Sequence, residues 1–428
     1  MNVFLQNFGC KVNVAETDSM RQLFIQNKWD VVSDPGQADA VVLNSCTVTA
    51  SGDKRMLQAI RRLRKTVPDA IFLVTGCYVQ AFPEDAAELP GVDIILGTKD
   101  RMKIPELLEY YLRNPGFLNA YTAFQPGECF ESLPQGSDPG HTRAFLKIQD
   151  GCNRFCSYCI IPYARGRCRS KNLSEIAEEA RKLTGYQEVV LCGINLACYG
   201  MGTDLCIADA VRTIADAGIP RIRLGSLEPD GLTDIVLEKL HAIPELMPHF
   251  HISVQSGCDK ILKAMHRHYT CAEYENLILK IRELFPGCAI TTDLMTGFPG
   301  ETEQDFAETI RFVEKIQFSE MHVFRYSPRP GTPAAEMPDQ IPDQIKKQRA
   351  EKLCMLSKQF HQNYLESCVG KIFHVLFERQ KIPAFHNGHA ENYVIVQVPA
   401  NPGENFRGQV YPVKATGIQD NKLIGECC

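Results

Sequence analysis

The sequence has 428 residues and a mass of 48.0 kDa, which at roughly 100–200 residues per domain allows two to four domains. Hydrophobic residues make up 44% and charged residues 23%, which is typical of a globular protein with a sizeable core. The formal net charge of -5 and the pI of about 6.2 exclude a broadly basic nucleic-acid coat, so any contact with RNA must be local.

The 18 cysteines bear on the cellular compartment. A secreted chain would pair so many cysteines in disulfides. However, the N-terminal stretch MNVFLQNFGCKVN lacks the basic region and the long apolar run of a signal peptide. No apolar run approaches the ~20 residues of a membrane span. We therefore expect a cytoplasmic protein that is not bound to a membrane and whose thiols bind metal or take part in chemistry.

A first domain is expected over residues 1–125, where short apolar runs alternate with helical patterns. Strands are predicted at 3–8, 40–45, 70–76 and 92–98, and helices at 16–27 and 52–67. This alternation favours an α/β domain in which helices cover both faces of a parallel sheet.

A cysteine directly follows three of these predicted strands, namely Cys10, Cys46 and Cys77. Adjacent parallel strands end at the same edge of a sheet, where open α/β sheets place their sites. If the cysteines served only packing, we would expect them within the apolar runs. The arrangement therefore predicts a three-thiolate iron–sulfur site in which one iron has no protein ligand.

The stretch at 125–142, QPGECFESLPQGSDPGHT, is predicted to be a linker. A second domain is expected over residues 140–366. Its strands are predicted at 144–150, 188–194, 221–227, 249–255, 288–298 and 320–326, and helical patterns at 173–185, 233–243 and 272–284. Six β/α units fall short of the eight of a full barrel, so we expect a partial, open (β/α)6 barrel.

A second group of cysteines lies in the stretch DGCNRFCSYCI (150–160), where Cys152, Cys156 and Cys159 have a C-x3-C-x2-C spacing. Such a loop can bind three irons of a [4Fe–4S] cluster and leave the fourth iron open to a substrate or cofactor. Two alternatives are a zinc site completed by Cys168 or a histidine, and an electron-transfer cluster with Cys168 as fourth ligand. Structural zinc usually uses paired C-x2-C halves, and ferredoxins need no large β/α domain.

The pattern changes after a long amphipathic helix predicted at 344–367. Short apolar runs (KIFHVLFE, NYVIVQVP and RGQVYPVKATGI) are separated by HNGHAE, ANPGEN and QDNK, which are predicted to be breaks. This pattern predicts a small all-β barrel over residues 367–428. Cys427 and Cys428 are expected to lie in a frayed tail.

The loop CNRFCSYC resembles the cluster loop of the radical S-adenosylmethionine (SAM) superfamily. In that superfamily SAM chelates the open iron, and an electron from the cluster then cleaves SAM to give a 5′-deoxyadenosyl radical. The resemblance implies that Tyr158 lies near the adenine of SAM and that Gly193 and Asn195 contact SAM. Further cofactor-binding candidates at or near predicted strand ends are Glu228, Gln255 and Asp293. An ordinary hydrogen-bonding role in a loop or strand explains each of these three residues, and also Gly193 and Asn195, equally well.

Nearly the whole chain resembles the methylthiotransferases, which join a three-cysteine domain, a radical SAM core and a TRAM domain. The motifs are FGCKVN, NSCTVT, VTGCY, KIQDGCNRFCSYCIIPYARGR, GFPGETEQDF and YSPRPGTPA. The resemblance implies two [4Fe–4S] clusters held by the six cysteines, which are then catalytic, and SAM used as methyl donor and as radical source. It also implies a sulfur donor and an electron donor such as a flavodoxin or ferredoxin.

The motif GCKVN, together with CIIPYARGR, most resembles the branch that acts on N6-threonylcarbamoyladenosine beside the tRNA anticodon. The alternatives are isopentenyladenosine in tRNA, whose branch more often has GCQMN, and an aspartate of a small-subunit ribosomal protein, whose branch has GCPKN. A non-catalytic iron–sulfur RNA-binding protein is a further class, but a structural cluster gains nothing from an open iron.

Two basic stretches are candidates for contact with RNA phosphates. They are Lys54, Arg55, Arg61, Arg62, Arg64 and Lys65, and then Arg165, Arg167 and Arg169. A solvated helix face explains the first stretch equally well. Arg325 and Arg329 are predicted to contact a substrate carboxylate or phosphate, because a guanidinium fork suits the carboxylate of a threonylcarbamoyl group.

Overall fold

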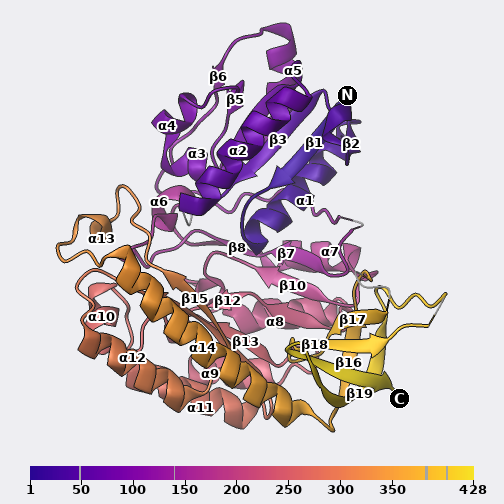
Figure 1. The fold of residues 1–428 in the computed structure, drawn as a ribbon. Helices are drawn as coiled ribbons and strands as arrows, with labels where there is room; N and C mark the ends of the chain where they lie inside the picture. The colour runs from indigo at the N-terminus through magenta and orange to yellow at the C-terminus, as the bar shows by residue number, and fades with distance from the viewer. Residues whose placement is uncertain (48–49, 139, 381–383, 402) are drawn as a thin grey trace.

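The computed structural model describes residues 1–47, 50–138, 140–380, 384–401 and 403–428, so the last two residues of the NSCTVT motif lie outside it. Along the chain, a parallel sheet with its helices is followed by a larger α/β unit and then by a small barrel (Figure 1). Among the described residues, no helix combines the length and the apolar character that a membrane span requires. The predicted fold class is confirmed.

The N-terminal sheet is parallel throughout, with the strand order β2-β1-β3-β4-β5-β6. The strands are β1 (Asn2–Asn7), β2 (Asp30–Val32), β3 (Ala40–Ser45), β4 (Ile71–Gly76), β5 (Ile94–Ile95) and β6 (Leu118–Asn119). The helices are α1 (Lys11–Gln26), α2 (Ala50–Thr66), α3 (Cys77–Ala81), α4 (Pro83–Ala87) and α5 (Ile104–Arg113). The sequence did not predict β2 and β6, because these strands have too few residues to show a period.

Helices pack on both faces of this sheet because successive strand residues point to opposite sides. Val41 and Leu43 of β3 belong to a core formed with α2. Ala40 and Val42 belong to a second core formed with α1 and α5. Helix α1 starts directly after Cys10, earlier than predicted, because polar and valine residues alternate over its first four positions, a period typical of a strand rather than of a helix.

The central unit contains two parallel sheets, β11-β10-β7 and β12-β13-β14-β15. Its strands are β7 (Ala144–Lys147), β10 (Val189–Cys192), β11 (Ile222–Leu224), β12 (Ser226–Leu227), β13 (His249–Ile252), β14 (Ala289–Thr296) and β15 (Glu320–Arg325). Strands β11 and β12 come from one predicted strand that Gly225 interrupts, so six strand positions form the predicted partial barrel. A short antiparallel pair, β8 (Gln149–Asp150) and β9 (Arg169–Ser170), lies beside it.

Helices alternate with these strands, as predicted. They are α6 (Ile161–Arg165), α7 (Leu173–Lys182), α8 (Ile207–Asp216), α9 (Asp234–His241), α10 (Asp259–Ala264), α11 (Cys271–Leu284), α12 (Glu303–Ile316) and α13 (Pro333–Glu336). The long helix α14 (Asp343–Cys368) packs against β15 and leads to the last unit.

The C-terminal strands form a closed barrel in the order β16-β17-β18-β20-β19. The strands are β16 (Ile372–Phe377), β17 (Phe385–His389), β18 (Ile395–Pro399), β19 (Val410–Gln419) and β20 (Lys422–Cys427). Two predictions were wrong here. The HNGHAE stretch supplies most of β17, where a histidine and a glycine take the buried positions that apolar residues usually occupy. Cys427 is part of β20 rather than a frayed tail.

A buried charge cluster docks the barrel onto the central unit. Glu188, just before β10, is fully buried and pairs with Arg221 and Arg223 at 3.2 and 2.9 Å. Arg221 donates a hydrogen bond to the carbonyl of His374 in the barrel, and Arg223 donates one to the carbonyl of Glu391, at 2.8 and 3.0 Å. Glu188 therefore fixes two arginines that donate hydrogen bonds to the barrel.

Candidate active site

The order of the N-terminal strands places the first group of cysteines. The order reverses between β1 and β3, and open α/β sheets form their ligand crevice beyond the carboxyl ends of strands at such a point. Cys10 follows β1, Cys46 follows β3, and Cys77 follows β4 as the first residue of α3. The structure thus brings all three cysteines to one edge of the sheet, as the sequence predicted.

Two asparagines connect the loops that carry Cys10 and Cys46. The Cys10 thiol lies 3.3 Å from Oδ1 of Asn13, and Nδ2 of Asn13 donates to Oδ1 of Asn44 and to the carbonyl of Ser45, at 3.1 and 3.0 Å. Both asparagines are fully buried. Sequence reasoning missed this role, although each asparagine lies within three residues of a cysteine in the quoted motifs.

Cys77 depends on the glycine before it. Gly76 has φ 103°, and a Cβ on it would lie 2.5 Å from the carbonyl oxygen of Ser45. Only glycine therefore lets β4 turn directly into α3 with the thiol at the sheet edge. The buried Arg165 of α6 donates from Nε to the Cys77 sulfur at 3.1 Å and is paired with Glu16 of α1.

The second group of cysteines lies on the loop between β8 and α6. The backbone N–H of Cys152 donates to the carbonyl of Gly166, and that of Cys159 donates to the carbonyl of Cys156, both at 3.0 Å. Arg267 donates to the Cys156 sulfur at 3.4 Å and also to Glu228 at 3.2 Å. Hydrogen bonds to sulfur ligands are one means by which proteins tune iron–sulfur clusters, so Arg165 and Arg267 take equivalent places at the two groups.

Both groups of cysteines line one cavity of about 510 Å³. An adjoining cavity of about 410 Å³ shares part of this lining and extends to Phe324, Arg325 and Tyr326. The residues common to both cavities are Tyr158, Cys159, Ile161, Gln255 and Asp293. Two sites predicted from distant parts of the sequence therefore open onto a single space.

Five of the six predicted SAM-contacting residues line the large cavity: Tyr158, Gly193, Glu228, Gln255 and Asp293. The sixth, Asn195, is buried and does not line it, and its side-chain amide has no hydrogen-bond partner within the described ranges. Gln255 has φ 68° and a buried Oε1 that likewise finds no partner among the described residues. Strained backbone and unpaired buried polar atoms are typical of ligand sites.

The two carboxylates that line the cavity have opposite pKa shifts. Burial raises the pKa of Glu228, and the opposing charge of Arg267 does not outweigh it. Burial also acts to raise the pKa of Asp293, but hydrogen bonds from His251 at 3.1 Å and Ser253 at 2.8 Å outweigh it and lower that pKa. Both carboxylates already have partners within the protein.

The chemistry of the cysteines fits iron–sulfur clusters. Burial raises the pKa of the Cys77 thiol to about 12 and that of Cys152 to about 11, and it raises the pKa of Cys159 further still. A cationic ligand would stabilise the thiolate form of each of these sulfurs. Three thiols facing one cavity are a soft donor set that suits iron. Cys168 does not line the cavity, and its thiol points to the carbonyl of Gly151 at 3.7 Å, which disfavours it as a fourth ligand.

The two arginines predicted to contact substrate differ in the structure. Arg325, at the end of β15, is exposed and lines the smaller cavity. Arg329 also lines that cavity but is buried, and its guanidinium pairs with Asp53 of α2 at 2.8 Å and contacts Thr47. Arg329 thus joins the loop after β15 to α2, and Arg325 is the more accessible of the two.

The basic stretches are also divided between structural and exposed positions. Arg64 donates to the carbonyls of Ala70 and Gly91 and pairs with Asp93, and Arg165 is fully buried at Cys77. The exposed basic residues of α2 are Lys54, Arg55, Arg61, Arg62 and Lys65. Their spacing of nearly whole turns places them on one face of the helix.

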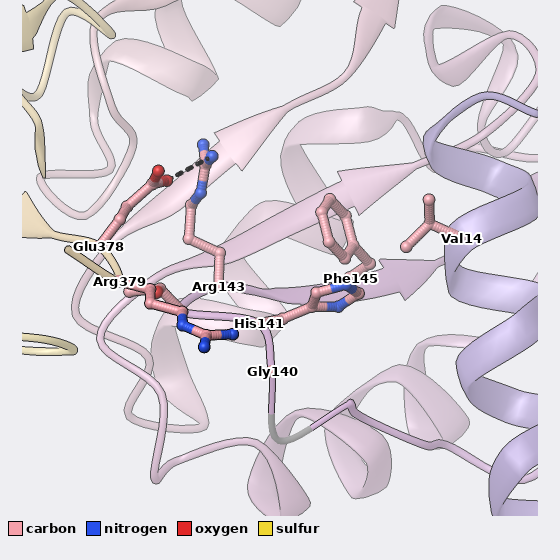
Figure 2. Close-up of a pocket in the computed structure, with 8 residues that line it drawn as sticks. Val14, Gly140, His141, Arg143, Phe145, Glu378 and Arg379 are labelled. Carbon is pink, nitrogen blue, oxygen red and sulfur yellow. Dashed lines mark hydrogen bonds and ion pairs between the residues drawn. The ribbon is translucent and has the colours of Figure 1, made fainter. Parts of the chain in front are cut away.

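A separate cavity of about 320 Å³ lies where α1, β7 and the C-terminal barrel meet. Figure 2 shows Arg143 extended toward Glu378 of the barrel, with which it forms an ion pair of 2.9 Å. None of the predicted site residues lines this cavity. It is therefore part of the junction that holds the barrel rather than of the candidate active site.

Comparisons with known proteins place the two cysteine groups in two matched families. Residues 146–313 match the Radical SAM superfamily, and residues 2–97 match the Uncharacterized protein family UPF0004. Among solved structures, the radical S-adenosylmethionine methyltransferase TsrM from Kitasatospora setae is similar with a TM-score of 0.58. Its sequence identity is 17%, over 78% of this chain and 75% of that one, so the likeness concerns the fold.

Curated relatives extend over nearly the whole chain. Threonylcarbamoyladenosine tRNA methylthiotransferase MtaB from Bacillus subtilis is 37% identical over 96% of this chain and 93% of its own length. The protein of the same name from Thermotoga maritima is 36% identical over 99% and 96%. The tRNA-2-methylthio-N(6)-dimethylallyladenosine synthase of Rickettsia canadensis is 33% identical over 99% and 98%.

Proposed function

Because the chain belongs to the radical SAM tRNA methylthiotransferase family, we propose that it converts N6-threonylcarbamoyladenosine beside the tRNA anticodon to its 2-methylthio derivative. The relatives named for this substrate are more similar to the chain than the one named for dimethylallyladenosine. The cofactors of the enzyme are SAM and two [4Fe–4S] clusters.

The observation that carries the proposal is that two groups of three cysteines line one cavity. Cys10, Cys46 and Cys77 would hold one cluster, and Cys152, Cys156 and Cys159 the other. When bound, the clusters and SAM supply the electron, the methyl group, the radical and the sulfur that C–H methylthiolation needs. Domain boundaries at 1–125, 140–366 and 367–428 belong to the same proposal, which assigns one cluster to each of the first two domains.

The chain's own side chains position the reactants. Tyr158 and Gly193 would contact SAM, and Gln255 is suited to this role by its unpaired buried oxygen. The predicted contact of Asn195 requires its unpaired buried amide to reach the cavity, which this residue does not line in the structure. Arg267 donates a hydrogen bond to Glu228, and His251 is hydrogen-bonded to Asp293. Both carboxylates therefore have a fixed orientation in the cavity. Arg325 would bind a carboxylate or phosphate of the substrate at the smaller cavity.

The exposed face of α2 supports a path for the RNA. It carries Lys54, Arg55, Arg61, Arg62 and Lys65, and no described carboxylate forms an ion pair with any of them. The ion pair between Asp53 and Arg329 ties the start of α2 to the loop beside Arg325. We expect the anticodon stem to lie along this face while the modified base enters the cavity.

The proposed reaction needs partners beyond the tRNA. A sulfur donor must replace the sulfur that each product removes, and an electron donor such as a flavodoxin or ferredoxin must reduce the clusters. The cytoplasm is the proposed location, because the tRNA substrate and such donors meet there.

Mass spectrometry of nucleosides tests the function. Anaerobically reconstituted protein is incubated with SAM, a reductant, a sulfide source and anticodon stem-loops carrying either N6-threonylcarbamoyladenosine or N6-dimethylallyladenosine. We expect 2-methylthio product predominantly from the first RNA. Product only from the second RNA would transfer the assignment to the dimethylallyl branch, and product from neither would contradict the proposed function.

A further inference from the structure

Lys11 differs from the other lysine and arginine residues that line the large cavity. Arg154 is paired with Asp230, and Arg267 is paired with Glu228. Lys11 is exposed, lines the same cavity and forms no ion pair with any carboxylate in the described part of the chain. The cavity therefore contains one cationic group whose charge the protein does not neutralise by direct contact.

The position of Lys11 is not one that helix stability favours. It is the first residue of α1 and follows Cys10 directly, and the first turn of α1 contains no acidic residue. A cation at a helix N-terminus is repelled by the helix dipole, so this lysine weakens the helix slightly. Its ammonium lies 5.8 Å from the centroid of the Tyr393 ring, a weak contact for such a group. Neither contact explains why a cation stands here.

The proposed substrate supplies an anion that Lys11 can bind. An N6-threonylcarbamoyl group carries a carboxylate, whereas an N6-dimethylallyl group is uncharged. A carboxylate transferred from water into a cavity must find a cation or strong donors. C2 is an atom of the six-membered ring of adenine, and N6 is the amino nitrogen attached to C6 of the same ring. An N6 substituent therefore lies near the protein groups beside the sulfur source, where Lys11 stands next to a proposed cluster ligand.

Resting on the proposed function, we propose that Lys11 binds the carboxylate of the threonylcarbamoyl group and thereby selects this nucleoside over an uncharged N6-alkyl adenosine. Arg325 lines the adjoining cavity and is exposed, so it is left to bind a phosphate of the RNA. Lys11 is then a specificity residue rather than a catalytic one, since it contacts a part of the substrate that does not react.

The test is to compare Lys11→Gln, Lys11→Arg and the wild type on two anticodon stem-loops, one with each N6 group. The ratio of kcat/KM for the threonylcarbamoyl RNA to that for the dimethylallyl RNA is measured. Losing a charged hydrogen bond should lower this ratio roughly tenfold to a hundredfold in Lys11→Gln, mainly through KM. Lys11→Arg keeps the charge and should retain most of the ratio. Lys358→Gln, an exposed lysine on α14, is the matched control and should leave the ratio unchanged.

A third RNA, in which the threonyl carboxylate is a methyl ester, separates charge from shape. Wild-type protein should bind the ester RNA about as weakly as the Lys11→Gln variant binds the acid RNA. The substitution should not weaken binding of the ester RNA any further. If Lys11→Gln weakens binding of the acid RNA and of the ester RNA equally, or if it leaves the kcat/KM ratio unchanged, the inference is overturned. Failure of wild-type turnover on both RNAs would contradict the proposed function instead, and the binding comparison would still decide the role of Lys11.

Discussion

At the residue scale, each cysteine group depends on side chains that are distant in sequence. Arg165 contacts Cys77 across 88 residues, and Arg267 contacts Cys156 across 111. Glu16, which is fully buried, pairs with Arg101 and Lys147 at 2.6 Å and with Arg165. The opposing charges hold the pKa of Glu16 well below its ordinary value although burial acts to raise it. The site is thus fixed by a charge network that joins the first unit to the cluster loop of the second.

The two arginines near the smaller cavity should respond differently to alanine substitution. Arg325→Ala removes an exposed side chain, so stability should change by no more than about 0.5 kcal/mol. Its kcat/KM for methylthiolation should fall roughly tenfold or more, because the substrate loses a charged partner. The measurement pairs methylthiolation kinetics with SAM cleavage to 5′-deoxyadenosine, which should change far less.

Arg329→Ala is the matched comparison, because it leaves Asp53 without its ion-pair partner. It should destabilise the protein by roughly 1–3 kcal/mol in denaturant unfolding. An equal loss of methylthiolation and SAM cleavage in Arg325→Ala would argue against a substrate contact. Unchanged stability in Arg329→Ala would argue against its role in joining α2 to the loop after β15.

At the element scale, α2 presents a row of cations about 16 Å long between Lys54 and Lys65. Replacing both Arg61 and Arg62 by glutamine should weaken binding of the anticodon stem-loop. The salt dependence should also become shallower, by close to one unit of log K against log salt for each RNA phosphate that is no longer neutralised. Fluorescence anisotropy at several salt concentrations measures both quantities.

The control for α2 is the double substitution Lys347→Gln and Lys358→Gln, which removes two exposed charges from one face of α14. It has the same effect on net charge and should leave affinity and salt slope close to those of wild type. If both double variants lose affinity equally, only net charge matters, and the exposed face of α2 is not the RNA path.

The junction with the C-terminal barrel should be sensitive to acid through Glu188. Burial acts to raise the pKa of Glu188, but Arg223, Arg221 and Arg143 outweigh it and lower that pKa to about 2. Its stabilising effect is therefore complete above the unfolded carboxyl pKa of about 4.3 and is lost as the pH falls from there toward about 2. Glu188→Gln should lower the unfolding free energy by about 3 kcal/mol at pH 6, because buried guanidinium groups lose their partner.

The pH dependence of the difference between wild type and Glu188→Gln isolates this carboxylate. Measured by denaturant unfolding of cluster-free protein, the difference should shrink steadily below about pH 4. A difference that stays constant from pH 6 to pH 3 would show that the ionised form of Glu188 does not hold the barrel in place.

Much of the element order could be predicted from the sequence, and the failures have physical reasons. Buried parallel strands such as β3 and β4 are continuous apolar runs, so their limits were predicted closely. Strand β17 was predicted to be a break, because its buried positions hold His386 and Gly388. A Cβ on Gly388 would lie 2.5 Å from a carbonyl oxygen of β16. Closure of the barrel therefore required a residue that normally indicates a turn.

The candidate site was predictable in its sulfur atoms but not in its surroundings. Cys10, Cys46 and Cys77 follow strands, a pattern visible in the sequence. The contacts of Arg165 and Arg267 depend on tertiary packing, which local patterns do not encode. The motif of Arg329 predicts a substrate contact, and the structure adds an ion pair with Asp53 that no local pattern in the sequence indicates.

At the scale of the whole molecule, the central feature is that two three-cysteine sites on separate α/β units open onto one cavity. Neither unit could perform the proposed reaction alone, because the cluster held by one site would supply the radical chemistry and the cluster held by the other would supply the sulfur. The buried ion pairs of Glu16 hold α1 of the first unit against Arg165 and Lys147 of the second. The fold thus brings the two proposed cluster sites onto one cavity, where both would face the same substrate.

The most direct test is to count iron and sulfide in anaerobically reconstituted protein. We expect about eight irons per chain in the intact protein, as two [4Fe–4S] clusters require. The triple variant Cys10→Ala, Cys46→Ala, Cys77→Ala should retain about four, and so should Cys152→Ala, Cys156→Ala, Cys159→Ala. About four irons in the intact protein, or a triple variant that retains all eight, would contradict the assignment of two clusters to these six cysteines.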